Sequence, residues 1–185
     1  MTERTNPSYV LTLWYKPGQT MQGLIESGGG HRLALVVAMF FGLVQAGRFY
    51  IANAEAGSVY YAIGSLAGLA GLYLFAWLLR NFGRWFGGRA SLREVRVGLG
   101  LGLLPWALLF LALVFFLGGS ADPTALANHY WLFFVGFLYG YVILLLSLAA
   151  ALRLSALKTF LCLIVTFIVS LFPLTLLIQL FSSVV

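Results

Sequence analysis

The chain has 185 residues, of which 62% are hydrophobic and only 9% are charged, with a formal net charge of +6. Soluble domains carry about 25% charged residues and about half apolar ones, so this composition excludes a soluble globular core. The single cysteine, Cys162, excludes an intramolecular disulfide and a cysteine-based metal site. The basic residues lie beside apolar runs, which favours anionic lipid headgroups over nucleic acid as their partner.

Residues 1–30 predict a cytosolic segment that ends in a short amphipathic helix at the membrane interface. Residues 1–16 are mixed in polarity and predict a flexible stretch. After Pro17, apolar side chains recur on one helical face until a run of three glycines at 28–30. A loop with scattered apolar residues is the alternative for this segment.

Residues 31–185 predict a transmembrane domain of five helices. A crossing needs about 20 mostly apolar residues, and it must be helical because open strands leave backbone groups unpaired in lipid. Five runs meet that length, at residues 33–51, 59–79, 97–117, 130–152 and 157–181. The predicted fold class is therefore all-α, a polytopic bundle of five transmembrane helices with one short interfacial helix.

The basic residues are distributed unequally between the two ends of these runs. All eleven Lys and Arg residues except Arg48 lie before the first run, between the second and third, or between the fourth and fifth. Such an excess marks the cytosolic side. We therefore predict that the N-terminus lies in the cytosol and the C-terminus on the opposite side of the membrane.

Local signals mark helix ends and bends. Ser91 and Glu94 form a capping-box pattern, so the third helix should begin near Leu92. Pro105 and Pro173 lie inside predicted spans, where each removes a backbone donor and should bend its helix. Such a bend either opens a path for a substrate or only shapes the bundle.

Small residues are spaced for close helix packing in the second, third and fourth spans. The pairs are Gly64 and Gly68, Gly98 and Gly102, and Gly136 and Gly140. Small residues let helix backbones approach where lipid gives no hydrophobic drive for association. They predict packing within the chain, with a homodimer face as the alternative. The last span has no glycine, so it lies at the periphery or meets a partner.

Arg48 is the candidate functional charge. It lies toward the end of the first span, and Gln45 precedes it by about one turn. A charge inside a span is a candidate functional group. Arg48 could instead snorkel to the interface or pair with Glu55, seven residues further on.

A predicted loop between the second and third spans combines basic and aromatic side chains. Its candidate contact residues are Arg80, Arg84, Trp85 and Arg89. This composition suits anionic headgroups on the cytosolic side, and it could equally dock a cytosolic protein.

No catalytic, cofactor-binding or metal site is predicted. His31 and His129 lie at opposite ends of the predicted spans, and no acidic pair or nucleophile–base arrangement is present. No span carries a central Asp, Glu or Lys, so an ion-coupled transporter also lacks its usual site. The chain is therefore not expected to be an enzyme.

Three features resemble the Yip family, whose eukaryotic members are Rab-interacting membrane proteins and which has a large bacterial branch. Residues 15–21 are similar to the family's N-terminal segment, in which Pro precedes an interfacial helix. Residues 87–106 are similar to the stretch in which a Gly-rich turn, a Ser-initiated helix and an intramembrane Pro follow in order. Five spans with a cytosolic N-terminus complete the resemblance, which points to the bacterial branch and therefore implies a place in a bacterial inner membrane. The eukaryotic Asp-Leu-Tyr-Gly-Pro-type motif is absent, so Rab binding is not implied.

Two functions follow from these observations. The first is a non-enzymatic scaffold that organises the membrane or binds a membrane-protein partner or a second copy, as the resemblance implies. The alternative is a small permease or lipid-handling protein that uses Pro105, Pro173 and Arg48.

Overall fold

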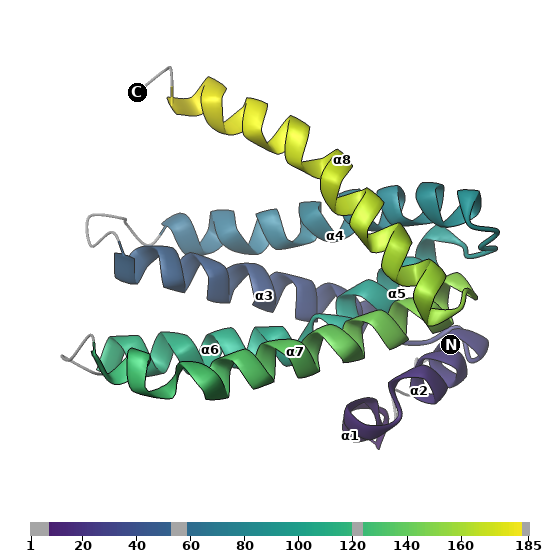
Figure 1. Cartoon of the computed structure of the whole chain (residues 1–185), viewed down its shortest axis with the longest axis horizontal. Coiled ribbons are helices and arrows are strands. Elements are labelled where there is room, and N and C mark those ends of the chain that lie inside the picture. The colour runs from purple at the N-terminus through teal and green to yellow at the C-terminus, as the bar shows by residue number, and fades with distance from the viewer. Residues whose placement is uncertain (1–7, 53–58, 120–123, 183–185) are drawn as a thin grey trace.

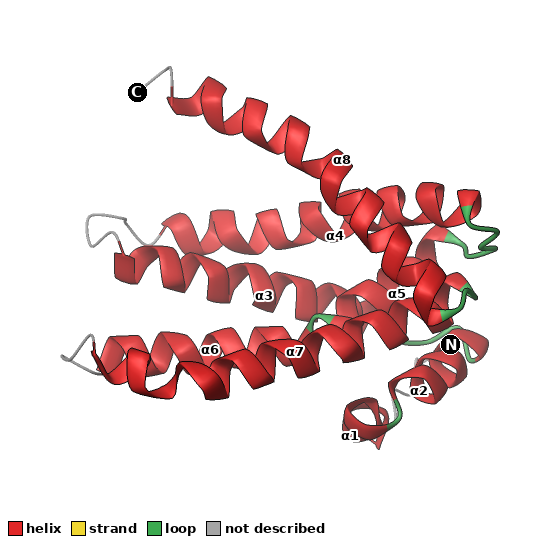
Figure 2. Cartoon of the chain, in the orientation of Figure 1, coloured by secondary structure: helices red, strands yellow, loops and turns green. Residues whose placement is uncertain are grey.

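The computed structural model describes residues 8–52, 59–119 and 124–182. Within these ranges the chain is helical and contains no strand (Figure 2). The helices are α1 (Ser8–Tyr15), α2 (Pro17–Glu26), α3 (His31–Ala52), α4 (Val59–Trp85), α5 (Leu92–Gly102), α6 (Leu104–Gly119), α7 (Thr124–Leu152) and α8 (Ala156–Ser182). Figure 1 shows α3, α4, α6 and α7 with their axes roughly aligned, while α8 leaves the bundle at an angle.

Three stretches of the described residues are long and apolar enough to cross a membrane: Val59–Trp85, Leu92–Phe116 and His129–Leu152. A shorter apolar helix covers Ala156–Leu171. The 22 residues of α3 run beside α4 (Figure 1). These lengths support an all-α membrane protein, and the count of five crossings stays a prediction.

The second predicted span continues as a helix beyond Leu79. Helix α4 runs on to Trp85, so residues 80–85, which the sequence places in a loop, form its last turns. Gly87 then ends the helix with a backbone φ of +91°, a left-handed conformation that costs glycine little. The Gly88 amide donates to the Gly83 carbonyl oxygen at 2.8 Å, which closes the helix end.

The third predicted span is divided into two helices. Ser91 caps α5 as the sequence predicts, because its hydroxyl accepts from the Glu94 amide at 3.3 Å while the Glu94 carboxylate accepts from the Ser91 amide. Helix α5 ends at Gly102 and α6 begins at Leu104, with Pro105 as its second residue. Since Pro has no backbone N–H and fits the first turn of a helix, it lies at this boundary.

The N-terminal segment is more ordered than its composition predicts. Residues 8–15, within the stretch predicted to be flexible, form α1. The Leu13 side chain is buried with Met21 and Leu24 of α2 against α3, α5 and α7. Trp14 stacks on Tyr139 of α7, and the Tyr139 hydroxyl donates to the Trp14 carbonyl oxygen. These contacts hold α1 and α2 against α7, so the segment is part of the bundle.

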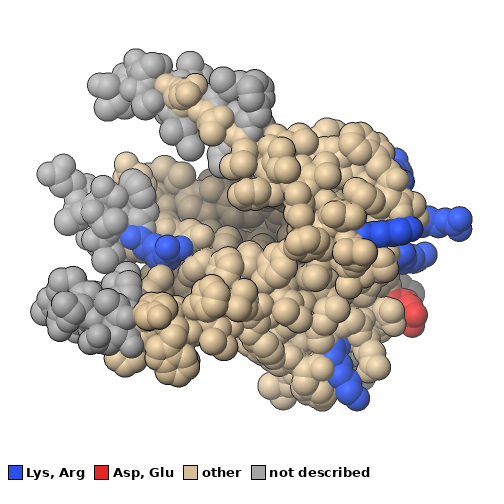
Figure 3. Space-filling model, viewed as in Figure 1, with Lys and Arg blue, Asp and Glu red and all other residues tan. Residues whose placement is uncertain are grey.

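The largest buried core lies toward one end of the bundle, where α4 ends and α5 and α8 begin. It includes Leu79, Phe82, Val95 and Leu152. Exposed basic side chains crowd the same end, and Figure 3 shows Lys and Arg gathered there. We call this the basic end, and its exposed basic residues include Arg84, Arg89, Arg93, Arg153 and Lys158.

Candidate functional site

Helices α3 and α4 touch through their backbones along a glycine seam formed by Ala38, Gly42, Ala46, Gly64 and Gly68. A Cβ atom on Gly64 would lie 2.6 Å from the Gly42 carbonyl oxygen, and one on Gly68 would lie 3.1 Å from the Gly42 Cα. Only glycine permits contact this close, so Gly64 and Gly68 pack within the chain.

The other predicted glycine pairs also face helices of the same chain. Gly98 and Gly102 of α5 meet α7, where a Cβ on Gly98 would lie 3.1 Å from the Ser147 carbonyl oxygen. Gly136 and Gly140 of α7 meet side chains of α6. All three pairs therefore allow close contacts inside the bundle.

A cleft of about 780 Å³ lies beneath α8, with walls from every helix from α3 to α8. Its lining is apolar, and α8 contributes Ile164 and Phe167 to it. Figure 3 shows the surface hollowed beneath α8, so the cleft opens sideways, across the helix axes. Gly71 of α4 lines the cleft and has no atom within 4 Å of a Cβ placed on it, which makes it an unfilled position.

One polar contact lies at the end of the cleft that is farther from the basic end. Gln45 lines the cleft, and its side-chain oxygen accepts a hydrogen bond from Arg48 Nη1 at 2.8 Å. The Arg48 guanidinium lies 4.5 Å from the centre of the Phe110 ring of α6, a cation–π contact. The sequence predicts Gln45 beside Arg48, whereas the contact with Phe110 requires the fold. Glu55, the other predicted partner of Arg48, lies outside the described residues.

The basic and aromatic contact residues occupy the basic end. Arg84 and Arg89 are exposed, and Trp85 is 76% exposed beside them at the end of α4. Trp85 packs edge-on against Phe82, with ring centres 4.9 Å apart. Arg80 is half-buried, one turn earlier on α4. The exposed side chains of Arg84, Trp85 and Arg89 form a rim next to apolar helices.

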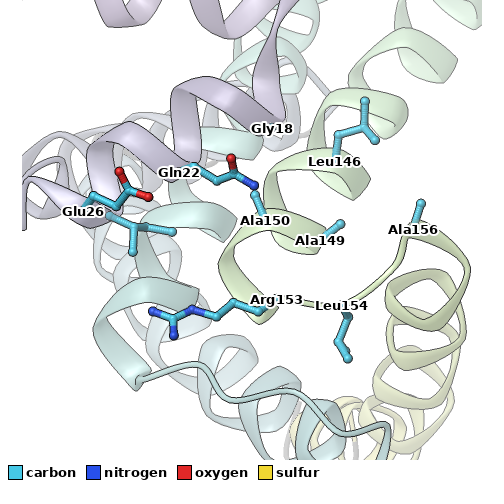
Figure 4. A pocket seen from close by; sticks show the side chains of 10 residues that line it. Gly18, Gln22, Glu26, Leu146, Ala149, Ala150, Arg153, Leu154 and Ala156 are labelled. Atoms are coloured by element: carbon cyan, nitrogen blue, oxygen red, sulfur yellow. The ribbon is translucent and has the colours of Figure 1, made fainter.

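A second cavity, of about 790 Å³, lies at the basic end between α2, α7 and α8 (Figure 4). Gln22 and Glu26 of α2 form one side of it, and Arg153 from the turn between α7 and α8 lies across from them. Arg153 also donates to Glu94 of α5 at 2.8 Å, with 60% of its side chain exposed. This contact links the start of α5 to the turn between α7 and α8.

The two prolines have different surroundings. Pro105 lies at the boundary of α5 and α6, and its neighbour Trp106 lines the cleft beneath α8. The Trp106 indole N–H donates to the Phe137 carbonyl oxygen of α7 at 3.0 Å. Pro173 lies inside α8, which is helical from Ala156 to Ser182, and its side chain is outside the described residues.

Comparison with known proteins decides the family. The chain matches the family model described as the Yip1 domain over residues 11–177. The chain belongs to the Yip1 family. The match begins within α1 and ends within α8, which confirms the resemblance found from the sequence and supports a place in a membrane. No curated protein and no solved structure matches the chain.

Two parts of this Yip1-family protein were missed by sequence reasoning. The spacing of small residues singles out Gly64 and Gly68 on α4 and not Gly71, although Gly71 marks the empty side of α4 in the cleft. Arg153 was counted only for membrane orientation, although it joins a cavity and an ion pair. Neither role has a local signal, because both depend on which helices meet. The described residues contain no group of three or more His, Cys, Asp or Glu that could hold a metal ion.

Proposed function

We propose that this Yip1-family protein is a non-enzymatic scaffold of the bacterial inner membrane, with its basic end in the cytosol. In this arrangement the N-terminus lies in the cytosol and the C-terminus on the opposite side. The observation that carries the proposal is the exposed rim of Arg84, Trp85 and Arg89 beside apolar helices. An amphipathic aromatic ring flanked by cations suits the headgroup level of an anionic membrane.

The scaffold would act by concentrating anionic lipid and a membrane-protein partner at the basic end. Exposed arginines form charge-assisted contacts with phosphate or carboxylate groups, and Trp85 adds apolar area at the same level. The cavity beside Gln22, Glu26 and Arg153 extends this surface toward α2. The surface therefore offers both signs of charge to a partner at the membrane face.

The test compares two variants at opposite ends of the bundle. Arg84→Gln with Arg89→Gln removes charge from the basic end, whereas Arg48→Gln removes charge from the other end. Each protein is crosslinked mildly in cells and purified, and the attached proteins and anionic lipids are identified by mass spectrometry. We expect the basic-end variant to lose partners and anionic lipid that the Arg48→Gln variant keeps. Recovery of the same proteins and lipids with both variants would contradict the proposal.

Lipid handling is a second candidate function, and the cleft beneath α8 favours it. The polar side chains that line the cleft include Gln45 and Thr166, and each is already bonded to a group of its own helix. Such walls suit an acyl chain better than a small polar solute. Vesicles that contain the protein and a headgroup-labelled phospholipid would test transfer between leaflets by chemical quenching from outside. A transfer rate equal to that of protein-free vesicles would rule this function out.

A further inference from the structure

We propose that the cleft beneath α8 is a binding site for the acyl chains of a membrane phospholipid, whose phosphate lies toward Arg48. The inference concerns occupancy and holds whether or not the lipid is moved between leaflets. It also stands apart from the scaffold function, which depends on the opposite, basic end.

The depth of the cleft matches the hydrocarbon layer. Along α4 its lining extends from Gly64 to Leu79, which is about 22 Å at the helical rise of 1.5 Å per residue. The hydrocarbon core is about 30 Å thick, so the cleft spans more than one leaflet's depth of chain. Neither end of the lining reaches the ends of α4, at Val59 and Trp85. The cleft therefore lies at the depth of the hydrocarbon core, where the surrounding molecules are lipid acyl chains.

The volume of the cleft suits acyl chains. A polymethylene chain about 4 Å wide fills roughly 300 Å³ over a length of 22 Å. The cleft of about 780 Å³ therefore has room for one or two acyl chains.

The opening of the cleft is continuous with the lipid-facing surface. Figure 3 shows the hollow on the side of the bundle, beneath α8. Phe167 and Ile164 line it from α8, and their side chains are 62% and 38% exposed. Phe75 of α4 faces the same cleft and is also exposed. A lipid chain can therefore enter sideways without crossing a polar region.

The polar end of the cleft supplies a contact for the headgroup. Gln45 is the lining residue there, and Arg48 is bonded to it. A guanidinium presents several N–H donors in a fixed plane, which suits phosphate oxygens. Arg48 thus gives the phosphate a charged partner, while the chains lie along the apolar walls toward Leu79 and Leu99.

The test fills the cleft and measures what binds in it. Gly71→Phe puts a ring into the cleft where a Cβ meets no atom, and Ala67→Leu is a smaller second variant on the same wall. Ala70→Phe is the matched control, because Ala70 is exposed on α4 and does not line the cleft. Each protein is reconstituted in phosphatidylethanolamine–phosphatidylglycerol vesicles with a phosphatidylglycerol that carries a diazirine in its acyl chain. After illumination, labelled peptides are identified by mass spectrometry.

We expect the wild type and the Ala70→Phe variant to be labelled on the α4 and α8 segments that line the cleft. Labelling of these segments should fall at least fivefold in Gly71→Phe and also fall in Ala67→Leu. Arg48→Gln should reduce it about threefold, because the phosphate loses its charged contact. Equal labelling of the cleft segments and of Trp131 and Phe134, which are exposed on α7 and do not line the cleft, unchanged by Gly71→Phe, would mean bulk lipid only and overturn the proposal. Unchanged labelling in Arg48→Gln would overturn the phosphate contact.

A crosslinking amino acid at Phe75 distinguishes a lipid from a protein in the cleft. Illumination in cells should add the mass of a phospholipid to the chain. A crosslink to a second copy or to another membrane protein would overturn the proposal. The crosslinking result at Phe75 does not depend on the basic-end variants. A protein crosslink there would therefore overturn lipid binding in the cleft and leave the scaffold proposal unchanged.

Discussion

Helices α3 and α8 both pack on α4, but by different means. The α3–α4 contact is a glycine seam in which backbone meets backbone over several turns. The α8–α4 contact involves Cys162, whose sulfur meets the Leu79 carbonyl oxygen. Thr159 and Thr166 of α8 are also almost fully buried, although α8 has no glycine. Beyond Thr166, the Phe167 and Ile168 side chains are more than 60% exposed. Helix α3 is therefore held against α4 along its length, whereas α8 is held mainly near its start.

The hydrogen bonds of Thr159, Cys162 and Thr166 explain why α8 is held less firmly than α3. The Thr159 hydroxyl donates at 3.1 Å to the carbonyl oxygen of Ser155, the residue just before α8, and the Thr166 hydroxyl donates at 2.8 Å to that of Cys162. They are satisfied within their own segment of the chain and add little attraction between helices. Cys162 supplies the cross-helix contact, a weak S–H bond of 3.6 Å to the Leu79 carbonyl oxygen. Helices α3 and α4 are packed tightly, whereas α8 is held loosely, and the cleft lies between α8 and this pair.

The largest expected effect comes from widening the glycine seam. In Gly42→Leu, the new Cβ would lie 2.9 Å from the Gly68 Cα and closer still to the Gly64 carbonyl oxygen, so two backbones must separate. We expect a loss of about 3 kcal/mol, the upper part of the overpacking range, because neither neighbour is a flexible side chain. The corresponding fall in Tm is about 6 to 12 °C. Thermal unfolding in detergent, followed by tryptophan fluorescence, measures it.

Gly71→Leu is the control for this prediction. Gly71 lies on the same helix, but a Cβ there meets no atom within 4 Å. We expect its Tm to stay within about 2 °C of the wild type, since surface-like changes cost little. Equal Tm losses in both variants would show that α4 tolerates no added bulk on any side, and the contrast between seam and cleft would be lost.

Adding bulk at Cys162 tests the looser contact. In Cys162→Leu, the larger side chain presses on the Leu79 carbonyl of α4, and α8 can respond by moving outward. We expect a loss of about 1 kcal/mol, the lower part of the overpacking range. Cys162→Ser keeps the volume and should be close to neutral by the same unfolding measurement. A loss as large as that of Gly42→Leu would mean that α8 is held as firmly as α3.

Much of the fold could be predicted because its signals are local. The apolar runs locate the long helices, and Ser91 with Glu94 marks the start of α5 correctly. Helix boundaries are harder to predict where two sequence signals compete, as at the end of α4. The polar residues after Leu79 suggested a loop, but they extend α4 until Gly87 provides the left-handed end. Helix α1 was missed because its order comes from contact with Tyr139, 125 residues from Trp14.

The candidate site was harder to predict because it depends on how helices are placed. Gln45 and Arg48 are one turn apart on α3, so their contact follows from the sequence. The cleft does not, since it exists only because α8 diverges from α4, and nothing local in the last span predicts that angle. The contact of Arg48 with Phe110 likewise joins two helices that are distant in the sequence.

A smaller effect on stability is expected for the ion pair between Glu94 of α5 and Arg153 in the turn between α7 and α8. Glu94 both completes the capping box of α5 and accepts from Arg153. Glu94→Ala removes both contacts and should cost about 1 to 1.5 kcal/mol, whereas Ser91→Ala removes the cap alone and should cost about 1 kcal/mol. Chemical unfolding in mixed micelles compares the two. A loss in Glu94→Ala that exceeds that of Ser91→Ala by more than about 2 kcal/mol would show that this exposed ion pair anchors α8.

The smallest effect is expected at Arg153, where two contributions offset each other. Its φ of +56° is a left-handed conformation at the end of α7, where the Leu154 amide donates to the Ala149 carbonyl oxygen at 3.1 Å. Arg153→Gly relieves about 1 kcal/mol of backbone strain and loses an exposed ion pair worth about 0 to 1 kcal/mol. The net change should stay within about 1 kcal/mol, with Arg153→Ala as a control that loses the ion pair and keeps the strain. A fall in stability of Arg153→Gly below Arg153→Ala would mean that a rigid turn, rather than the Cys162 contact with α4, sets the direction of α8.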